Sequence, residues 1–221
     1  MMFMQIDRIY NHIYKDGHSR SPKLAVEIAN QAFEFLHCTA SPRVQFCKVV
    51  KRICWERPLR GWKKLNTDGA FNGDIGLAGC GGIVRDERGQ WVNGFSKRIG
   101  LINSFEAELW GLREGLLLCC NLNISHLEIE LDAKAVVEVL GRLSYVNNII
   151  SPILDDCRLL VSRFQQVRIK HCFRVVNRYA DSLARLSLTQ DADSSSFVNL
   201  PVDLFNVMYF NRTCPKPFVF S

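Results

Sequence analysis

The spacing of apolar residues changes character near residue 60. In Lys23–Cys38 (KLAVEIANQAFEFLHC) apolar side chains recur near helical spacing, which predicts a helix. From Trp62 onward they alternate with polar ones in short runs, which predicts strands. Three strands are expected at WKKLNTD, GGIVRD and WVNGFSKRI, and the turn DERG between the last two favours an antiparallel meander. The first strand is expected to end at Asp68, where Gly69 interrupts the pattern.

The following part of the chain alternates helical and strand patterns. Residues 103–120 place Leu109, Leu112 and Leu116 on one helical face. HLEIELD (residues 126–132) alternates apolar and acidic side chains, which predicts a fourth strand. Two helices, a fifth strand and a closing helix are expected at residues 133–143, 150–165, 167–173 and 177–188. This order predicts an α/β fold, a five-stranded mixed sheet of three antiparallel strands and then two parallel ones, flanked by helices.

The same patterns divide the chain into four parts. Residues 1–54 are predicted to be a helical N-terminal extension, and 55–61 (WERPLRG) a linker because it contains proline and glycine and has no period. Residues 62–190 are the predicted main domain. Residues 191–221 are the predicted C-terminal tail, which begins within a polar loop, TQDADSSSF.

Composition is that of a folded globular protein, with 48% hydrophobic and 23% charged residues. No apolar run approaches the roughly 18–20 residues that span a bilayer, so neither a transmembrane helix nor a signal peptide is predicted. The nine cysteines are odd in number and form no C-x-x-C pair, which favours reduced thiols and a cytoplasmic or nuclear location. The net charge of +6 is typical either of solubility or of a polyanionic partner.

Four acidic residues stand at the ends or edges of the predicted elements, and they are Asp68, Glu108, Asp132 and Asp181. Three of them also have a structural alternative to metal binding. Asp68 could start an Asx-turn before Gly69, and Asp132 could cap the helix that follows it. Asp181 could complement the dipole of the last helix.

Taken together, the four carboxylates favour a metal site. If the first and fourth strands are neighbours, Asp68 and Asp132 end near the same place, while Gly111 and Gly115 would let the Glu108 helix lie close to the sheet. Carboxylates gathered without basic partners repel one another, so they take up protons or bind cations. Their oxygens are ligands that Mg²⁺ and Mn²⁺ prefer, and two such ions can promote phosphodiester hydrolysis.

Five linked blocks occur in order within residues 55–190. They are W-x-x-P-x-x-G-W-x-K-L-N-T-D-G-A, GCGGIVRDERGQWVNGFS, AELWGLREGL, IELDAKAVVEVL and H-x₅-N-x₃-D-x-L-A-R. These blocks resemble the ribonuclease H family, above all the plant type found at the C-terminal end of non-LTR retrotransposon reverse transcriptases and in stand-alone relatives. The resemblance implies a ribonuclease H-like fold and an enzyme that cuts the RNA strand of RNA–DNA hybrids.

The resemblance also implies roles for individual residues. The metal-binding and catalytic carboxylates would be those of Asp68, Glu108, Asp132 and Asp181, holding two Mg²⁺ ions, with Mn²⁺ as an alternative. His171 would be the family's mobile-loop histidine, which is thought to assist product or proton movement; the alternative is a histidine at a strand end.

Contacts with the hybrid would fall on two segments, the backbone at Gly69, Ala70, Phe71 and Asn72, and Ser104 at the start of the Glu108 helix. Specificity for RNA would come from the 2′-hydroxyl group. The chain departs from the family at Ser104-Phe105, where many relatives carry asparagines, and it lacks a long basic insertion between the middle helices.

The leading hypothesis is therefore a Mg²⁺-dependent endonuclease that acts on RNA–DNA hybrids, with no membrane partner. The alternative is a catalytically silent nucleic-acid-binding module derived from a retrotransposon, and a structural protein without a nucleic-acid role is the third hypothesis. The sequence specifies no oligomeric state.

Overall fold

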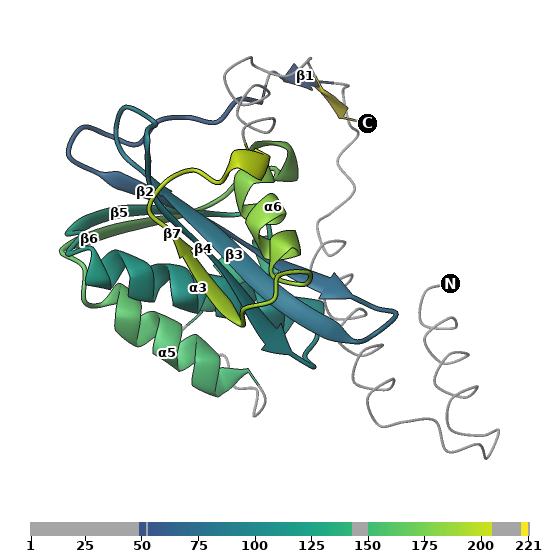
Figure 1. Cartoon of the computed structure of the whole chain (residues 1–221). Coiled ribbons are helices and arrows are strands. Elements are labelled where there is room, and N and C mark those ends of the chain that lie inside the picture. The colour runs from purple at the N-terminus through teal and green to yellow at the C-terminus, as the bar shows by residue number, and fades with distance from the viewer. Residues whose placement is uncertain (1–48, 52, 143–149, 205–217, 221) are drawn as a thin grey trace, which may run out of the picture. The chain divides into compact units, whose positions relative to one another are not determined.

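The structure, a computed structural model, describes residues 49–51, 53–142, 150–204 and 218–220 (Figure 1). The chain divides into two units, Met1–Arg43 and Val44–Ser221, and every described residue belongs to the second. The helices predicted within residues 1–48 lie outside the described residues. At the end of that predicted extension, residues 49–51 form a short strand that pairs antiparallel with residues 218–220.

The described elements follow the predicted alternation of strands and helices. The strands are β1 (Val49–Lys51), β2 (Lys63–Asn72), β3 (Leu77–Arg85), β4 (Trp91–Gly100), β5 (His126–Leu131), β6 (Gln166–His171), β7 (Ser194–Phe197) and β8 (Phe218–Phe220). The helices are α3 (Ser104–Asn121), α4 (Lys134–Leu140), α5 (Ser151–Val161) and α6 (Arg178–Leu186), with short 3₁₀ turns η1 (Arg174–Val176) and η2 (Val202–Leu204).

The main sheet of the described residues has the strand order β6-β5-β2-β3-β4-β7. β2, β3 and β4 form the predicted antiparallel meander, whereas β5 lies parallel to β2 and β6 parallel to β5. The fold class is confirmed, but the sheet has six strands rather than five. The additional strand, β7, lies in the predicted polar loop and pairs antiparallel with β4. Its sequence, SSSF, has no apolar alternation, so only backbone pairing at the sheet edge reveals it.

β2 is longer than the sequence pattern predicts. It does not end at Asp68 but continues through Gly69 to Asn72, and Asp68 pairs with Gly81 of β3. Gly69 is needed here for close packing rather than for a break. A Cβ atom at Gly69 would lie 2.5 Å from the backbone nitrogen of Glu108 in α3, so only glycine allows this approach.

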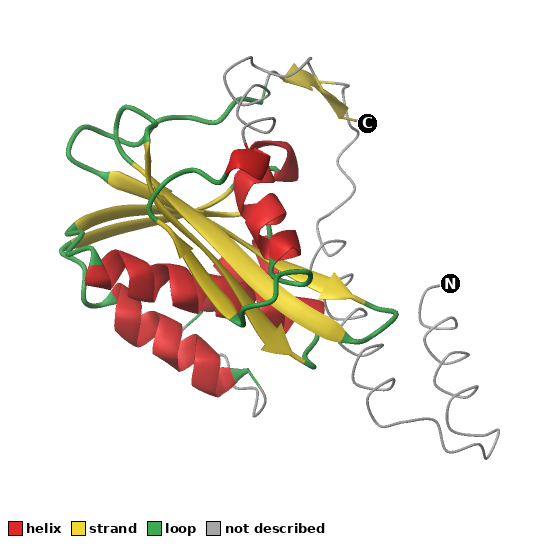
Figure 2. Ribbon diagram, in the orientation of Figure 1, coloured by secondary structure: helices red, strands yellow, loops and turns green. Residues whose placement is uncertain are grey.

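Helices cover both faces of the sheet (Figure 2). α3 packs on the face of β2 that carries Leu65 and Thr67, and α5 packs on α3. α6 lies on the opposite face, where a Cβ at Gly81 would meet the backbone of α6 at 2.3 Å. Asp68 pairs with Gly81, and paired residues of neighbouring strands share a face, so the Asp68 side chain lies on the α6 side.

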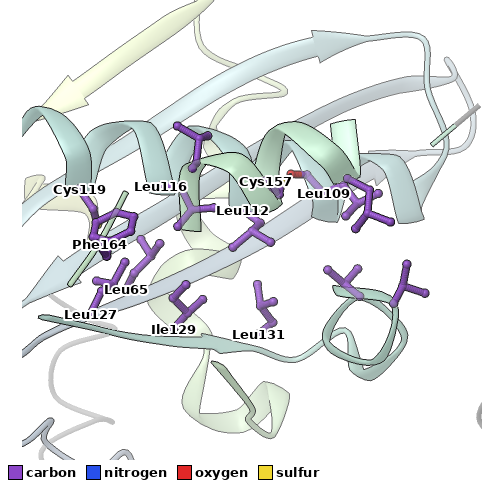
Figure 3. Close-up of a cluster of buried hydrophobic side chains, with 14 of the residues drawn as sticks. Leu65, Leu109, Leu112, Leu116, Cys119, Leu127, Ile129, Leu131, Cys157 and Phe164 are labelled. Atoms are coloured by element: carbon purple, nitrogen blue, oxygen red, sulfur yellow. Dashed lines mark hydrogen bonds between the residues drawn. The ribbon is translucent and has the colours of Figure 1, made fainter. Parts of the chain in front are cut away.

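The main hydrophobic core lies between α3, α5 and the sheet (Figure 3). Leu109, Leu112 and Leu116 are fully buried, which confirms their predicted common face. They meet the apolar side chains of β5 at alternate positions, Leu127, Ile129 and Leu131. Complete burial of one such side chain contributes about 1.5–3 kcal/mol, so this core fixes the position of α3.

The start of α3 is fixed by a capping box. Asn103 Oδ1 accepts a hydrogen bond from the Glu106 backbone N–H at 2.9 Å, and Glu106 Oε2 accepts one from the Asn103 backbone N–H at 3.1 Å. This places Glu108 in the first turns of the helix, directly beside β2.

Within the described residues, no helix is long and apolar enough to cross a membrane. Cys54 is disulfide-bonded, which differs from the prediction of reduced thiols throughout. Among the described cysteines, those that are free are Cys80, Cys119, Cys120, Cys157 and Cys172.

Gly69→Ala should destabilise the fold by about 1–3 kcal/mol, the range for overpacking a filled interior, because its Cβ would collide with the backbone of α3. Gly73→Ala is the matched control, since its Cβ would lie 3.7 Å from the nearest atom, in the Phe71 ring. Its stability should be unchanged or raised by about 0.4–1 kcal/mol. Urea unfolding of both variants measures the difference; equal stability would contradict the close packing.

Candidate functional site

Three carboxylates from three elements converge at one place. Asp68 comes from β2, Glu108 from α3 and Asp132 from the residue after β5, and each offers an oxygen within 4.8 Å of the other two. The register of the parallel pair explains the first contact, because Thr67 pairs with Leu131 and the two aspartates follow directly.

The helix α3 brings the third carboxylate. A Cβ at Gly111 would lie 2.9 Å from the backbone oxygen of Asp68, so the helix approaches β2 more closely than a larger residue permits. Glu108 is carried toward Asp68 by this approach. The glycines of α3 therefore position the site, as their sequence spacing predicts.

Electrostatics at this site penalise ionised carboxylates. Burial raises the pKa of Asp68 well above its ordinary value, and the charges of Glu108, Asp132 and Asp181 raise it further. Burial and the charge of Asp132 raise the pKa of Glu108. Asp68 Oδ2 and Glu108 Oε2 are buried and have no hydrogen-bond partner among the described residues. Unpaired, buried carboxylate oxygens at this spacing fit a hard divalent cation.

Asp132 does not cap α4, although its position in the sequence would allow it to. The N-cap of α4 is Ala133, and no side-chain hydrogen bond caps this helix among the described residues. Asp132 Oδ1 instead accepts a hydrogen bond from Asn177 Nδ2 at 3.2 Å. Asn177 Nδ2 also donates to the backbone oxygen of Thr67 at 2.9 Å, so one buried amide ties Asp132 to β2.

Sequence reasoning gave Asn177 no role. Its signal was the spacing of the H-x₅-N-x₃-D block, in which the asparagine stands six residues after His171 and four before Asp181. Because its contacts run to residues 45 and 110 positions away, no local pattern could identify them.

Asp181 lies outside the group of three. It stands in the first turn of α6, and its two oxygens accept from arginines: Oδ1 from Arg174 Nη2 and Oδ2 from Arg185 Nε, both at 3.0 Å. Its charge nevertheless raises the pKa of Asp68. Asp181 is thus close enough to influence the pKa of Asp68, but its carboxylate is held by two arginines.

His171 ends β6, and its Nε2 lies 3.2 Å from the backbone oxygen of Asp132, with the ring edge against Phe173. An imidazole nitrogen at this distance from a carbonyl oxygen carries the proton and donates it. The exposed side chain therefore lies beside the backbone of Asp132, one of the three converging residues.

The residues predicted to meet nucleic acid lie along the same strand and helix. Gly69, Ala70, Phe71 and Asn72 form the partly exposed end of β2, beyond Asp68. Ser104 is the exposed first residue of α3. Both segments are close in sequence to a carboxylate of the site, the first to Asp68 and the second to Glu108.

A buried charged network underlies the aspartates on the α6 side of the sheet. Lys64, which is fully buried, forms ion pairs with Glu128 at 2.7 Å and Glu130 at 2.5 Å. Burial alone would raise the pKa of Glu128, but hydrogen bonds from Lys64 and Lys170 lower it. Because side chains alternate along a strand, Lys64 and Asp68 share a face, as do Glu130 and Asp132.

The predicted linker contacts this network. Asn66 Oδ1 accepts hydrogen bonds from Arg85 at 2.7 Å and from the indole of Trp55 at 3.2 Å. The Arg85 guanidinium lies 3.6 Å from the centre of the Trp55 ring, and Lys64 also donates to the backbone oxygen of Glu56 at 2.7 Å. Residues 55 and 56 therefore help to satisfy the buried charges.

The sheet order, the covering helices and the converging carboxylates define a protein of the ribonuclease H class. More particularly, the chain belongs to the reverse transcriptase-like family, whose model matches residues 66–187. The family assignment that the five sequence blocks predicted is confirmed.

Three relatives illustrate this similarity. The chain is 36% identical over 154 residues to an Arabidopsis thaliana protein whose name provisionally assigns it to ribonuclease H; the match covers 70% of this chain and 25% of that protein. The chain thus spans about a quarter of that relative's length. Ribonuclease H1 from Halobacterium salinarum is 27% identical, with a TM-score of 0.53 over 59% of this chain and 99% of that one. LC11 ribonuclease H1, solved in complex with an RNA/DNA hybrid, is 21% identical with a TM-score of 0.51 over 56% of this chain and 94% of that one, a likeness of fold.

The metal-free protein should lose stability as the pH rises above about 4, where free carboxyl groups ionise. In the unfolded chain Asp68 and Glu108 release their protons there, whereas in the folded protein their raised pKa values retain them. The folded state then binds more protons, so the free energy of unfolding falls with rising pH. Thermal melts between about pH 5 and 8 without divalent ions test this. If Asp68→Asn kept the full slope, the assignment of this pH dependence to the site would be wrong.

Proposed function

We propose that the chain is a Mg²⁺-dependent endonuclease that hydrolyses the RNA strand of RNA–DNA hybrids. The observation that carries the proposal is the convergence of Asp68, Glu108 and Asp132, with two buried carboxylate oxygens that lack partners among the described residues. Membership of the reverse transcriptase-like family and the ribonuclease H relatives support this reaction.

The proposed metal ligands are the carboxylates of Asp68, Glu108, Asp132 and Asp181, and two Mg²⁺ ions, or Mn²⁺ in their place, fit this set of oxygen donors. When bound, the ions would activate a water and stabilise the leaving oxygen of the phosphodiester. Asn177 keeps the carboxylate of Asp132 directed at the site. The exposed imidazole of His171, which contacts the backbone of Asp132, would carry a proton between the site and solvent.

The proposed nucleic-acid contacts follow the site outward along the chain. The partly exposed end of β2, from Gly69 to Asn72, would meet the strand next to the cleaved bond, and Ser104 would meet it from the start of α3. Recognition of the RNA strand would require a hydrogen bond to its 2′-hydroxyl group, which the DNA strand lacks.

A catalytically silent nucleic-acid-binding module is the second candidate. The observation that favours it is the state of Asp181, whose two oxygens are engaged by Arg174 and Arg185 rather than directed into the group of three. The two candidates predict the same binding and differ in turnover.

A cleavage assay decides between them. Purified protein is incubated with a hybrid labelled on the RNA strand, beside RNA–RNA and DNA–DNA duplexes of the same sequence, in Mg²⁺ and in EDTA. We expect internal cuts in the RNA strand of the hybrid only, and only with Mg²⁺. Binding of the hybrid without any cleavage would support the silent module, and cleavage that persists in EDTA would contradict the metal mechanism.

A further inference from the structure

Arg174 is a cation at the border of the carboxylate site. It lies in η1, between β6 and α6, and its Nη2 donates to Asp181 Oδ1 at 3.0 Å. Its side chain is 70% exposed, whereas that of Asp181 is 21% exposed. One of the five guanidinium N–H groups is accounted for by this bond, and the exposure leaves others open to solvent.

The charge of Arg174 reaches the rest of the site. The pKa of Arg174 is raised first by its hydrogen bond to Asp181 and further by the charges of Asp181, Asp68 and Asp132. In the opposite direction, Arg174 is among the groups that lower the pKa of Glu108. The charge of this one guanidinium therefore interacts with all four carboxylates.

A cation at this position would reduce the charge repulsion between the substrate and the site in the proposed reaction. A phosphodiester is an anion, and it must approach the three converging carboxylates and the nearby charge of Asp181. A guanidinium binds two phosphate oxygens with a planar pair of N–H groups, which is why arginine is common at phosphate sites. An ion pair between exposed groups is weak, so its partner can be exchanged.

We propose that Arg174 changes partners during the reaction. Without metal it is the counter-ion of Asp181; when Asp181 binds a divalent cation instead, the freed guanidinium holds a phosphate oxygen of the RNA strand beside the carboxylates. This inference rests on the proposed function, and it assigns Arg174 as a substrate-binding residue whose availability depends on metal binding.

Arg185 provides the matched control. It holds the other oxygen of Asp181, also at 3.0 Å, and is 66% exposed, but it sits one turn further along α6 as an i,i+4 partner within the helix. Arg174→Gln and Arg185→Gln each remove one ion pair from Asp181. Only the first removes the proposed phosphate contact.

The first measurement is calorimetric titration of Mn²⁺ into each protein without nucleic acid. Both variants should bind the ion more tightly than the parent, by about two- to fivefold, because an exposed ion pair no longer competes for Asp181. An Arg174→Gln affinity equal to that of the parent would overturn the competition between arginine and metal. Thermal melts of both variants check that they are folded.

The second measurement is hybrid affinity in Ca²⁺, with gels to verify that the hybrid stays intact. Arg174→Gln should weaken binding about tenfold and reduce the slope of log K against log salt by about 0.7–0.9, the value for one phosphate contact. Arg185→Gln should bind with the parent's affinity or more tightly and keep the parent's slope. Equal losses in the two variants, or an unchanged slope for Arg174→Gln, would overturn the phosphate contact.

The outcomes separate this inference from the proposed function. A parent that cleaves the hybrid while Arg174→Gln keeps full affinity and slope overturns the inference alone. A parent that binds the hybrid without cutting it overturns the proposed reaction, and the affinities and slopes still decide the role of Arg174. A parent that binds no hybrid overturns both.

Discussion

Asp68→Asn should lose about 10²- to 10⁴-fold of the Mg²⁺-dependent cleavage rate, since metal stabilisation of transition-state charge amounts to several kcal/mol. Asp68 is the most buried of the three converging carboxylates, and its Oδ2 has no partner among the described residues. The amide keeps the shape of the side chain but removes the negative charge that a cation requires. Single-turnover cleavage of a labelled hybrid measures this loss.

The same variant should be more stable than the parent when metal is absent. The amide removes a buried group whose ionised form is opposed by burial and by three neighbouring carboxylates. Thermal melts with and without Mg²⁺ should show the parent stabilised by the ion and Asp68→Asn little changed by it. Asp155→Asn is the control, since Asp155 is exposed on α5 and pairs only with Arg158 among the described residues. A loss of activity that is equal in both variants would contradict a metal site at Asp68.

Lys64→Met should destabilise the fold by about 3–5 kcal/mol, the range for removal of one partner from a buried ion pair. Lys64 neutralises two glutamates of β5 whose side chains are only 5% and 11% exposed. Methionine fills the space of the lysine stem but leaves Glu128 and Glu130 with less positive charge. Urea unfolding measures the difference.

Two further variants isolate the cause. Adding Glu128→Gln and Glu130→Gln to Lys64→Met should restore part of the stability, because the uncompensated charges are then absent. Lys134→Met removes an exposed lysine that pairs with Glu138, and its effect should remain below about 1 kcal/mol. If the triple variant is no more stable than Lys64→Met, charge imbalance is not the cause of the loss.

Much of the fold could be predicted because its signals are local. The alternation in HLEIELD predicts β5, and the leucine spacing in residues 103–120 predicts α3 and its buried face. β7 could not be found in this way, since its pairing depends on the open edge of β4 and not on its own side chains. The end of β2 was misplaced because Gly69 was interpreted as a break, whereas its role is to admit α3.

The acidic residues of β5 show the same contrast between what the local sequence predicts and what the tertiary structure decides. Their alternation with leucine and isoleucine predicts a strand, but it does not distinguish a solvent-facing side from a buried one. The structure buries Glu128 and Glu130, and this is possible because Lys64, some 64 to 66 positions earlier in the chain, lies on the neighbouring strand.

The sequence by itself determined the order of strands and helices, the family, and the four carboxylates that could serve a metal site. Only the tertiary structure decided that Asp68, Glu108 and Asp132 meet while Asp181 is held by Arg174 and Arg185. The physical reason is that convergence depends on the register of β2 with β5 and on the close approach of α3. Both arise from packing between segments that are distant along the chain.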